Sequence, residues 1–356
     1  MPGPRQALDS LHLLVRMLRA MEAGKPVTIA ALARMLAVPA DAIGALPAMR
    51  EAADAGIKRT ASGELLLARA FDKLDLQALA QALPKAARSV FDIHVVDVTA
   101  STNADLVAAT NSLPSGRVLV AELQTAGRGR RGRAWHAPLG GSLAFSLLWK
   151  FAGGAASLSG LSLAVGLAVA RALERCGAAG VMLKWPNDLL LRRDAGWAKL
   201  GGVLIEIAGP SNGPVHAVIG IGLNLRLGSG AALIDQPAAG LDMLGLAVSR
   251  NHLLALVLED LALVLRAFAA EGFAPFVAQW NLRHAFAGRR VAMSAEGTAL
   301  TEGTALTEGT ALTEGIALGV DRDGALLLET PNGLRRVTSG ELSLRAAPML
   351  RRCQEP

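Results

Sequence analysis

The fold assignment depends on the stretch Gly127-Arg-Gly-Arg-Arg-Gly-Arg-Ala-Trp135. It contains the letters G-x-G-x-x-G, which in a dinucleotide-binding fold mark a turn that opens a helix. The context excludes that interpretation, because Pro138 and Gly140-Gly141 follow too soon for a helix. The acidic residue that the fingerprint needs is also missing, since no Asp or Glu occurs from Leu123 to Leu173.

A glycine–arginine loop without acids is instead suited to a polyanion. Glycine lets backbone N–H groups approach an oxyanion, and the guanidinium groups of Arg128, Arg130 and Arg133 can pair with phosphate or carboxylate. We expect this arginine loop (residues 127–135) to be mobile when empty and ordered when filled. A solvated basic loop or an RNA-binding arginine tract is the alternative.

The second motif is Lys184-Trp-Pro-Asn-Asp188, which is followed by the apolar residues Leu189 to Leu191. Asp188 could hold a magnesium ion or a basic group, and Asn187 could hydrogen-bond a base or a phosphate. The alternative is a plain turn, because Pro-Asn-Asp is ordinary turn chemistry.

Three weaker features accompany these motifs. Ser101-Thr-Asn103 precedes a helix, and Thr102 with Asp105 fits a capping box. Lys199 directly precedes Leu200-Gly-Gly202, and Gly220-Ile-Gly-Leu-Asn224 ends a strand with small residues and one amide. The alternative for Lys199 is a solvated lysine at the start of a strand, and the alternative for Gly220 to Asn224 is a strand with a bulge.

The chain around the motifs divides into three segments. Residues 1–88 predict three helices and a hairpin, the pattern of a winged helix-turn-helix: Leu8 to Ala23, Thr28 (as cap) to Leu36, Ala40 to Ala55, and two strands within Ile57 to Ala70. Residues 89–283 alternate strands and helices, as an α/β domain does: strands at 93–98, 118–123, 143–149, 200–208 and 215–225, and helices at 105–111, 161–175 and 253–271.

Residues 284–356 predict a small β-barrel, with hairpin signals at Asp323-Gly324 and Asn332-Gly333. This segment contains a tandem Gly-Thr-Ala-Leu-Thr-Glu repeat within residues 297–318. Its unit of six residues is even, so each added unit keeps the same strand face inward. A duplication that lengthened one hairpin explains the repeat.

Composition narrows the class of protein. The 356 residues carry a net charge of +6, which alone says little about nucleic acid. Two cysteines, Cys176 and Cys353, cannot form a disulfide framework or a cysteine-rich zinc site. The N-terminus has no signal-peptide core, and the longest apolar run, Leu158 to Ala170, is too short for a bilayer. We therefore expect a cytoplasmic protein without a membrane span.

Together and in this order, the five features closely resemble the biotin–protein ligase family, specifically its bifunctional BirA type, which is both ligase and biotin-operon repressor. The tail matches as well, around Gly319 to Glu329 and Gly340 to Arg345. The resemblance implies a mixed α+β multidomain protein: an N-terminal winged helix-turn-helix, a central class II synthetase-like domain of the biotin/lipoate ligase type, and a C-terminal SH3-like β-barrel.

The resemblance also implies roles for individual residues. The biotin ureido ring would be surrounded by Ser101, Thr102, Asn103 and Gln124, and the loop that closes over it would include Arg128, Gly129 and Arg130. Lys199 would neutralise the biotin carboxylate. The adenine and ribose would meet Trp135, Asn187 and Asn224, and the triphosphate would meet Arg133 and Lys184. Asp188 would serve a magnesium ion or the incoming lysine, and with Arg130 and Lys199 it would carry the catalysis.

The cofactors implied are ATP, biotin and Mg²⁺, and the partner is the biotin carboxyl carrier protein of acetyl-CoA carboxylase. A homodimer and operator DNA are further implied partners. The predicted recognition helix, Pro39 to Ala53, departs from the pattern: it has one Arg against Asp41 and Glu51, and Pro47 inside it costs about 3 kcal/mol or more. Two interpretations of the N-terminal segment therefore stay open: a domain that binds operator DNA, and a degenerate domain kept for packing or regulation.

Three other classes of protein compete with this interpretation. A lipoate–protein ligase shares the catalytic fold, but the arginine loop with its Trp135 argues against it. A ligand-sensing transcription factor does not need Asp188 together with Lys199. An arginine-loop RNA-binding protein is disfavoured because aromatic residues make up only 4% of the chain.

Overall fold

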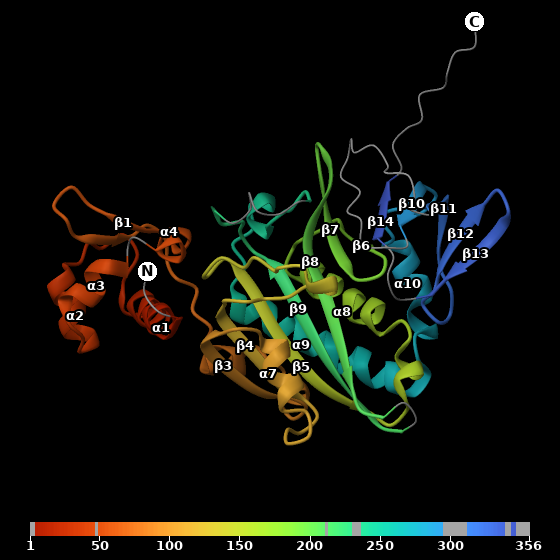
Figure 1. The fold of residues 1–356 in the computed structure, drawn as a ribbon, viewed down its shortest axis with the longest axis horizontal. Helices are drawn as coiled ribbons and strands as arrows, with labels where there is room; N and C mark the ends of the chain where they lie inside the picture. Colours follow the sequence, from red (N-terminus) through yellow and green to blue (C-terminus); the bar gives the residue numbers. More distant parts are fainter. Residues whose placement is uncertain are drawn as a thin grey trace, which may run out of the picture.

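The computed structural model describes residues 4–46, 49–210, 213–229, 236–294, 312–338 and 343–346. Figure 1 shows three parts side by side: a small N-terminal group of helices with a hairpin, a large central sheet with its helices, and a smaller C-terminal sheet.

The N-terminal part follows the predicted order with one correction. Its elements are α1 (Pro4–Ala20), α2 (Ile29–Leu36), α3 (Ala40–Ala45), α4 (Arg50–Ala55), β1 (Ile57–Arg59) and β2 (Leu65–Leu67). Thr28 caps α2 as predicted, accepting a hydrogen bond from the Ala31 N–H at 3.2 Å. The single third helix from Ala40 to Ala55 is wrong, because α3 and α4 are separate short helices. A proline at position 47, outside the described residues, lacks the N–H that a continuous helix needs.

A seven-stranded mixed sheet forms the central part, in the order β3-β4-β5-β9-β8-β7-β6. The strands are β3 (Asp92–Thr99), β4 (Arg117–Gln124), β5 (Ser142–Phe151), β6 (Val181–Lys184), β7 (Asp188–Arg193), β8 (Gly196–Ala208) and β9 (Val215–Asn224). Its β3–β4 pair is parallel, and the other neighbouring pairs are antiparallel. The sheet therefore brings the ends of β4, β7, β8 and β9 to the same region as the loop after β4.

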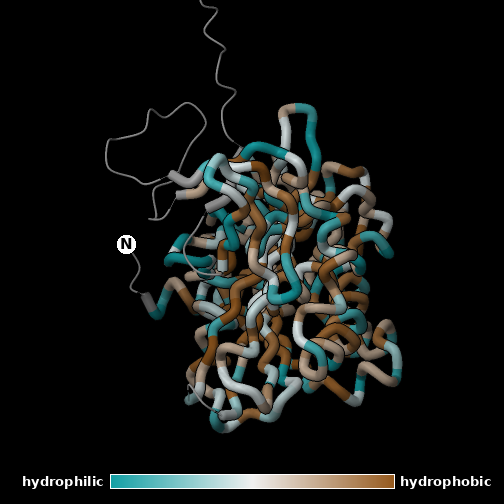
Figure 2. The backbone as a smooth tube through the Cα atoms, turned by 90° about the vertical axis from the view of Figure 1, so that its right-hand side faces the viewer, coloured by the Kyte–Doolittle hydropathy of each residue, from teal (hydrophilic) through white to brown (hydrophobic). Residues whose placement is uncertain are grey.

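Helices cover the two faces of this sheet unequally. On one face lie α8 (Leu161–Arg175) and α9 (Arg250–Glu271), which pack against each other and form the main core with odd-numbered strand residues such as Leu147, Ile219 and Leu223. On the other face α7 (Thr102–Ala108) places Leu106 against Leu148 and Val218. Figure 2 shows hydrophobic segments gathered in the interior and hydrophilic segments at loops and tips.

The core helix also accounts for the most apolar stretch of the chain. Among the described residues, one segment, Ala155–Arg175, has the length and composition of a membrane span. Of its most apolar window, 67% is buried inside the protein, where α8 packs between the sheet and α9. Its apolar composition is that of a fully buried helix.

Two short helices before the sheet belong to the central core. They are α5 (Leu76–Ala82) and α6 (Lys85–Arg88), and their residues Leu79, Leu83 and Ala87 are buried with α9 and the sheet. These helices therefore pack with the central core, and the boundary at residue 88 stays a prediction. A further helix, α10 (Val277–Leu282), leads to the C-terminal part.

The C-terminal part is an antiparallel sheet in the order β13-β12-β11-β10-β14. Its strands are β10 (Arg290–Ser294), β11 (Leu312–Val320), β12 (Leu326–Thr330), β13 (Gly333–Val337) and β14 (Ser343–Ala346). Both predicted hairpins are confirmed, with Gly324 (φ 79°) and Gly333 (φ 98°) in the left-handed region that favours glycine. The winged helix and the SH3-like barrel stay predictions. Most of the repeat lies in residues 297–311, outside the described residues, and its end at residues 312–318 lies in β11.

Candidate active site

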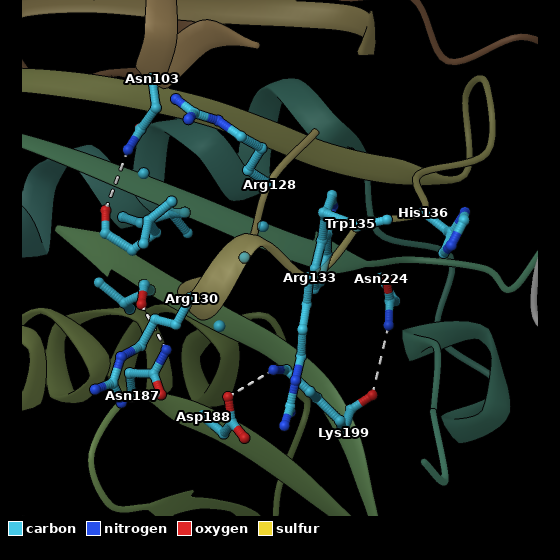
Figure 3. Close-up of a pocket in the computed structure, with 18 of the residues that line it drawn as sticks. Asn103, Arg128, Arg130, Arg133, Trp135, His136, Asn187, Asp188, Lys199 and Asn224 are labelled. Carbon is cyan, nitrogen blue, oxygen red and sulfur yellow. Dashed lines mark hydrogen bonds and ion pairs between the residues drawn. The ribbon is translucent and has the colours of Figure 1, made fainter. Parts of the chain in front are cut away.

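A single cavity of about 320 Å³ lies between the sheet and the arginine loop, and every predicted site residue lines it. Those residues are Ser101, Thr102, Asn103, Gln124, Arg128, Gly129, Arg130, Arg133, Trp135, Lys184, Asn187, Asp188, Lys199 and Asn224. Figure 3 shows Asn103 and Arg128 toward one end of the cavity and Asp188 with Lys199 toward the other. The fold thus brings together residues that are spread over more than a hundred positions of sequence.

The glycines of β9 make room for two other site residues. A Cβ on Gly220 would lie 2.4 Å from Asn103 Oδ1, and a Cβ on Gly222 would lie 2.7 Å from the Trp135 ring. The pairing of β9 with β5 and β8 runs without a shift, so the bulge considered as an alternative is wrong. The small residues of the motif are therefore explained by close approach of Asn103 and Trp135 to the strand.

The helix that carries Ser101-Thr-Asn103 begins differently from the prediction. Ser101 is the N-cap, accepting a hydrogen bond from the Ala104 N–H at 3.4 Å, so the capping box of Thr102 with Asp105 is wrong. The Thr102 hydroxyl lies 2.7 Å from Ser146 Oγ, and Asp105 accepts a hydrogen bond from the Thr99 hydroxyl at 2.5 Å. A cap at Ser101 frees Thr102 to face the cavity.

Asp188 holds two lysines at the positively charged end of the cavity. Its Oδ1 lies 2.6 Å from Lys199 Nζ, and its Oδ2 lies 3.3 Å from Lys184 Nζ. Burial alone would raise the pKa of this carboxyl, but the charges of Lys199 and Lys184 outweigh burial and lower it to about 2. Asp188 is therefore ionised at neutral pH and fixes both ammonium groups.

The Lys184-Trp-Pro-Asn-Asp188 motif is more than a turn. Asn187 Nδ2 donates to the Val203 carbonyl at 2.7 Å, which joins the motif to β8. Trp185 is buried, and its Nε1 donates to the Gly324 carbonyl at 3.1 Å in the β11–β12 turn. The motif therefore ties the cavity to the C-terminal sheet.

The arginine loop folds back on itself without opening an α-helix. The Gly129 N–H donates to the Arg133 carbonyl at 2.7 Å, and the Trp135 N–H donates to the Gly127 carbonyl at 2.8 Å. A short 3₁₀ turn from Arg130 to Gly132 lies between these bonds, with Arg131 at φ 59°. The exclusion of the dinucleotide fingerprint agrees with this conformation, and mobility of the empty loop stays a prediction.

Acids from elsewhere in the fold meet the loop arginines. Arg128 Nη2 lies 3.6 Å from Glu206 Oε1, and Arg130 Nη1 lies 3.5 Å from Asn187 Oδ1, next to Asp188. Burial, followed by the charge of Arg131, lowers the pKa of Arg130, while Asp188 opposes that shift. No acid lies near the loop in the sequence, but the fold brings Glu206 and Asp188 close to its arginines.

Trp135 contributes an unused donor. Its Nε1 is buried and has no hydrogen-bond partner among the residues that the structure describes. A buried indole N–H normally finds an acceptor. The indole, packed against Gly222, is placed to receive a ligand with an acceptor in its ring plane.

Sequence reasoning missed two residues of this region, Ser146 and Glu206. Ser146 interrupts the otherwise apolar Leu143 to Trp149, and Glu206 interrupts the apolar end of β8. A lone polar residue in a buried strand was the available signal, because such a residue needs a partner. Its partner could not be identified without the register of the sheet.

No cluster of three or more His, Cys, Asp or Glu residues that could hold a metal occurs in the described parts of the chain. Asp188 offers one carboxylate, and both of its oxygens contact lysines. This donor set does not fit a metal ion held by the protein itself, because Mg²⁺ needs several oxygen ligands. The prediction for Asp188 therefore narrows to one ligand of a magnesium ion that a nucleotide would bring.

Comparisons with known proteins show to which family the chain is similar. A family model described as the biotin/lipoate A/B protein ligase family matches residues 95–224, and one described as the biotin protein ligase C-terminal domain matches residues 288–345. The chain is 36% identical to the bifunctional ligase/repressor BirA of Escherichia coli over 256 residues, which cover 72% of this chain and 74% of the relative.

Two further proteins extend the comparison. The chain is 33% identical to the biotin–[acetyl-CoA-carboxylase] ligase of Paracoccus denitrificans over 250 residues, which cover 68% of this chain and 97% of that ligase. The solved structure of the biotin protein ligase from Aquifex aeolicus in complex with biotin and ATP aligns with a TM-score of 0.59 at 28% identity, covering 72% of this chain and 99% of that one.

Proposed function

Because the chain belongs to the biotin protein ligase family, we propose that it activates biotin with ATP and transfers the biotinyl group to a lysine of an acceptor protein. The observation that carries the proposal is the cavity that all the predicted site residues line. One end of it is polar and mostly uncharged, and the other end gathers Lys184, Lys199 and Arg130 around Asp188. Biotin has the matching polarity, with an uncharged ureido ring at one end and a carboxylate at the other.

The positively charged end of the cavity suits the first chemical step. A biotin carboxylate oxygen attacks the α-phosphorus of ATP, the bond from that phosphorus to the bridging oxygen breaks, and pyrophosphate leaves with the bond electrons. Two anions must approach each other, so fixed positive charge is what the step needs most. Lys199, held 2.6 Å from Asp188, and Arg130 supply that charge.

In the second step the acceptor lysine loses a proton to solvent, and its neutral amine attacks the carbonyl carbon of biotinyl-AMP. The C–O bond to the phosphate breaks, AMP leaves with the bond electrons, and the second proton that the nitrogen loses passes to the departing phosphate or to water. Asp188 is a weak general base, because its pKa of about 2 lies far below neutral pH. We assign Asp188 to orienting Lys199 and the incoming ammonium group. Closure of the arginine loop would keep water from the mixed anhydride.

The remaining residues fit the nucleotide. Trp135 offers a flat ring and an N–H to adenine. Asn224, whose Nδ2 lies 3.4 Å from the Lys199 carbonyl, would lie near the ribose. Arg133 and Lys184 would meet the triphosphate. Magnesium would enter as part of the substrate MgATP, and none of these steps depends on a metal bound by the protein.

The acceptor that we propose is a biotin carboxyl carrier protein, in keeping with the ligase of Paracoccus denitrificans, whose name gives acetyl-CoA carboxylase as its target. A homodimer stays a prediction, which sedimentation with and without biotin and ATP would test. Cytoplasmic location stays a prediction as well.

For the N-terminal part we propose a packing role rather than operator binding. Its α4 faces the central domain, where Asp54 Oδ1 accepts a hydrogen bond from the Ser229 N–H at 2.8 Å. Arg19 of α1 lies 2.6 Å from Asp97 of β3 and 3.3 Å from Glu122 of β4. A recognition helix must present its side chains to a groove of DNA, and the short α4 is turned to the protein instead.

The proposed function is tested by measuring pyrophosphate release from ATP with biotin, with lipoate and with neither. We expect release that depends on biotin and not on lipoate. Release with lipoate would support the lipoate ligase, and no release with either would contradict activation of the ligand by ATP.

A further inference from the structure

A chain of polar side chains runs along the mostly uncharged end of the cavity. It links Glu206 on β8, Asn103 on α7, Ser146 on β5, Thr102 on α7 and Gln124 on β4. Asn103 Nδ2 donates to Glu206 Oε2 at 2.8 Å, and Ser146 Oγ donates to Asn103 Oδ1 at 2.5 Å. Ser146 Oγ lies 2.7 Å from Thr102 Oγ1, and Gln124 Oε1 accepts from the Thr102 N–H at 2.8 Å. The three middle residues are at most 4% exposed.

The charge at one end of this chain fixes the direction of its hydrogen bonds. An ionised carboxylate can only accept, so Asn103 must present its NH₂ group to Glu206 and its oxygen to Ser146. The single hydroxyl hydrogen of Ser146 is then used on Asn103, so the Thr102 hydroxyl can donate to Ser146 Oγ at 2.7 Å or to Gln124 Oε1 at 3.1 Å. In either case Gln124 Oε1 accepts from the Thr102 N–H at 2.8 Å, and the Gln124 Nε2 lies on the other side, near Gly127.

Glu206 itself is not among the described residues that line the cavity. Figure 3 shows Asn103 pointing across the cavity toward the strands of the sheet. The second carboxylate oxygen of Glu206 lies 3.6 Å from Arg128 of the arginine loop. This contact is half exposed on the arginine side, and such ion pairs contribute little. The shorter, partly buried hydrogen bond to Asn103 is therefore the stronger of the two.

We propose that Glu206 is a positioning residue that sets the order of donors and acceptors offered to the ureido ring. The inference rests on the proposed function, since it takes biotin as the ligand. A cyclic urea carries two N–H donors and one carbonyl acceptor in fixed positions. An amide such as Asn103 can turn over and exchange its donor and acceptor ends. The carboxylate of Glu206 prevents that exchange.

The test replaces Glu206 with the isosteric amide. In Glu206→Gln the side chain can donate or accept, so the only acceptor among the described residues that still fixes the NH₂ group of Asn103 is the Leu204 carbonyl, at the longer distance of 3.5 Å. We expect the biotin Kd, measured by calorimetry, to rise about 10- to 100-fold, the effect of losing one hydrogen bond to a charged group. Desthiobiotin keeps the ureido ring and should weaken by the same factor. The KM for ATP should change less than about threefold.

Two controls separate positioning from a general loss of structure. Glu271→Gln alters an exposed acid at the end of α9 and should leave the biotin Kd unchanged. In an Asn103→Ala background, Glu206→Gln should have little further effect on the biotin Kd, because it acts through Asn103. An unchanged Kd in Glu206→Gln, or a loss of the same size in the Asn103→Ala background, would overturn the inference.

Measurements on the unaltered protein separate a failure of the Glu206 inference from a failure of the proposed function. If it releases pyrophosphate with biotin but Glu206→Gln binds biotin normally, the inference fails and the proposed function stands. If it shows no biotin-dependent release and no biotin binding, the proposed function fails and the role of Glu206 fails with it.

Discussion

Asp188→Asn removes the charge that holds the two lysines of the cavity. Burial would raise the pKa of the Asp188 carboxyl, but Lys199 and Lys184 lower it from 3.8 to about 2. That difference corresponds to about 2 kcal/mol of stability when the group is charged. The side chain is only 11% exposed, so solvent screens the interaction little. We expect Asp188→Asn to lower the free energy of unfolding by about 2 kcal/mol at pH 7.

The sign of the pH dependence follows from the depressed pKa. Stability from Asp188 is fully present above pH 3.8, the value of the unfolded chain, and is lost as pH falls through about 2. Urea unfolding of both proteins from pH 7 to pH 2.5 should show a gap that narrows below about pH 4. Other carboxylates titrate in both proteins and cancel in the difference.

Asp194→Asn is the matched control, because Asp194 is an exposed acid in the β7–β8 hairpin. It should change the free energy of unfolding at pH 7 by less than about 0.5 kcal/mol. Equal stability of Asp188→Asn and the unaltered protein at pH 7 would refute the reasoning. So would a gap that stays constant down to pH 2.5.

Three further substitutions test separate parts of the account. Lys199→Gln should slow adenylate formation by about 100-fold, the scale of one preorganised contact, and a normal rate would transfer its role to Lys184. Arg130→Gly should speed dissociation of biotinyl-AMP and cause labelling of lysines on bystander proteins, and unchanged retention without stray labelling would remove the loop from the site. Arg250→Met leaves the buried carboxylate of Glu122 without the guanidinium at 2.6 Å, so it should lower the free energy of unfolding by about 3–5 kcal/mol in urea titrations; a loss below about 1 kcal/mol would contradict the importance of that pair.

Much of the local structure could be predicted from the sequence. The apolar run of α8 and the turn glycines at positions 324 and 333 are signals that depend on near neighbours, and the structure agrees with each. The cap at Thr28 is of the same kind. The prediction of one continuous third helix was wrong because it followed the apolar periodicity and not the proline at position 47, which indicates a break.

The composition of the cavity could be predicted by resemblance, but its interactions could not. The partner of Arg128 is Glu206, which lies on β8 and meets the loop only after the sheet has formed. The reason for Gly220 is Asn103, which approaches from α7. Both contacts depend on strand register and on crossover order, which are long-range properties that local patterns do not carry.

The most direct test of the central claim is transfer of labelled biotin to a biotin carboxyl carrier domain. The protein, ATP and labelled biotin are mixed with the domain or with a variant whose acceptor lysine is replaced by arginine. We predict label on that one lysine, which requires both ATP and biotin. Pyrophosphate release without label on the carrier domain, or equal label on the arginine variant, would contradict the claim that this chain is a biotin–protein ligase.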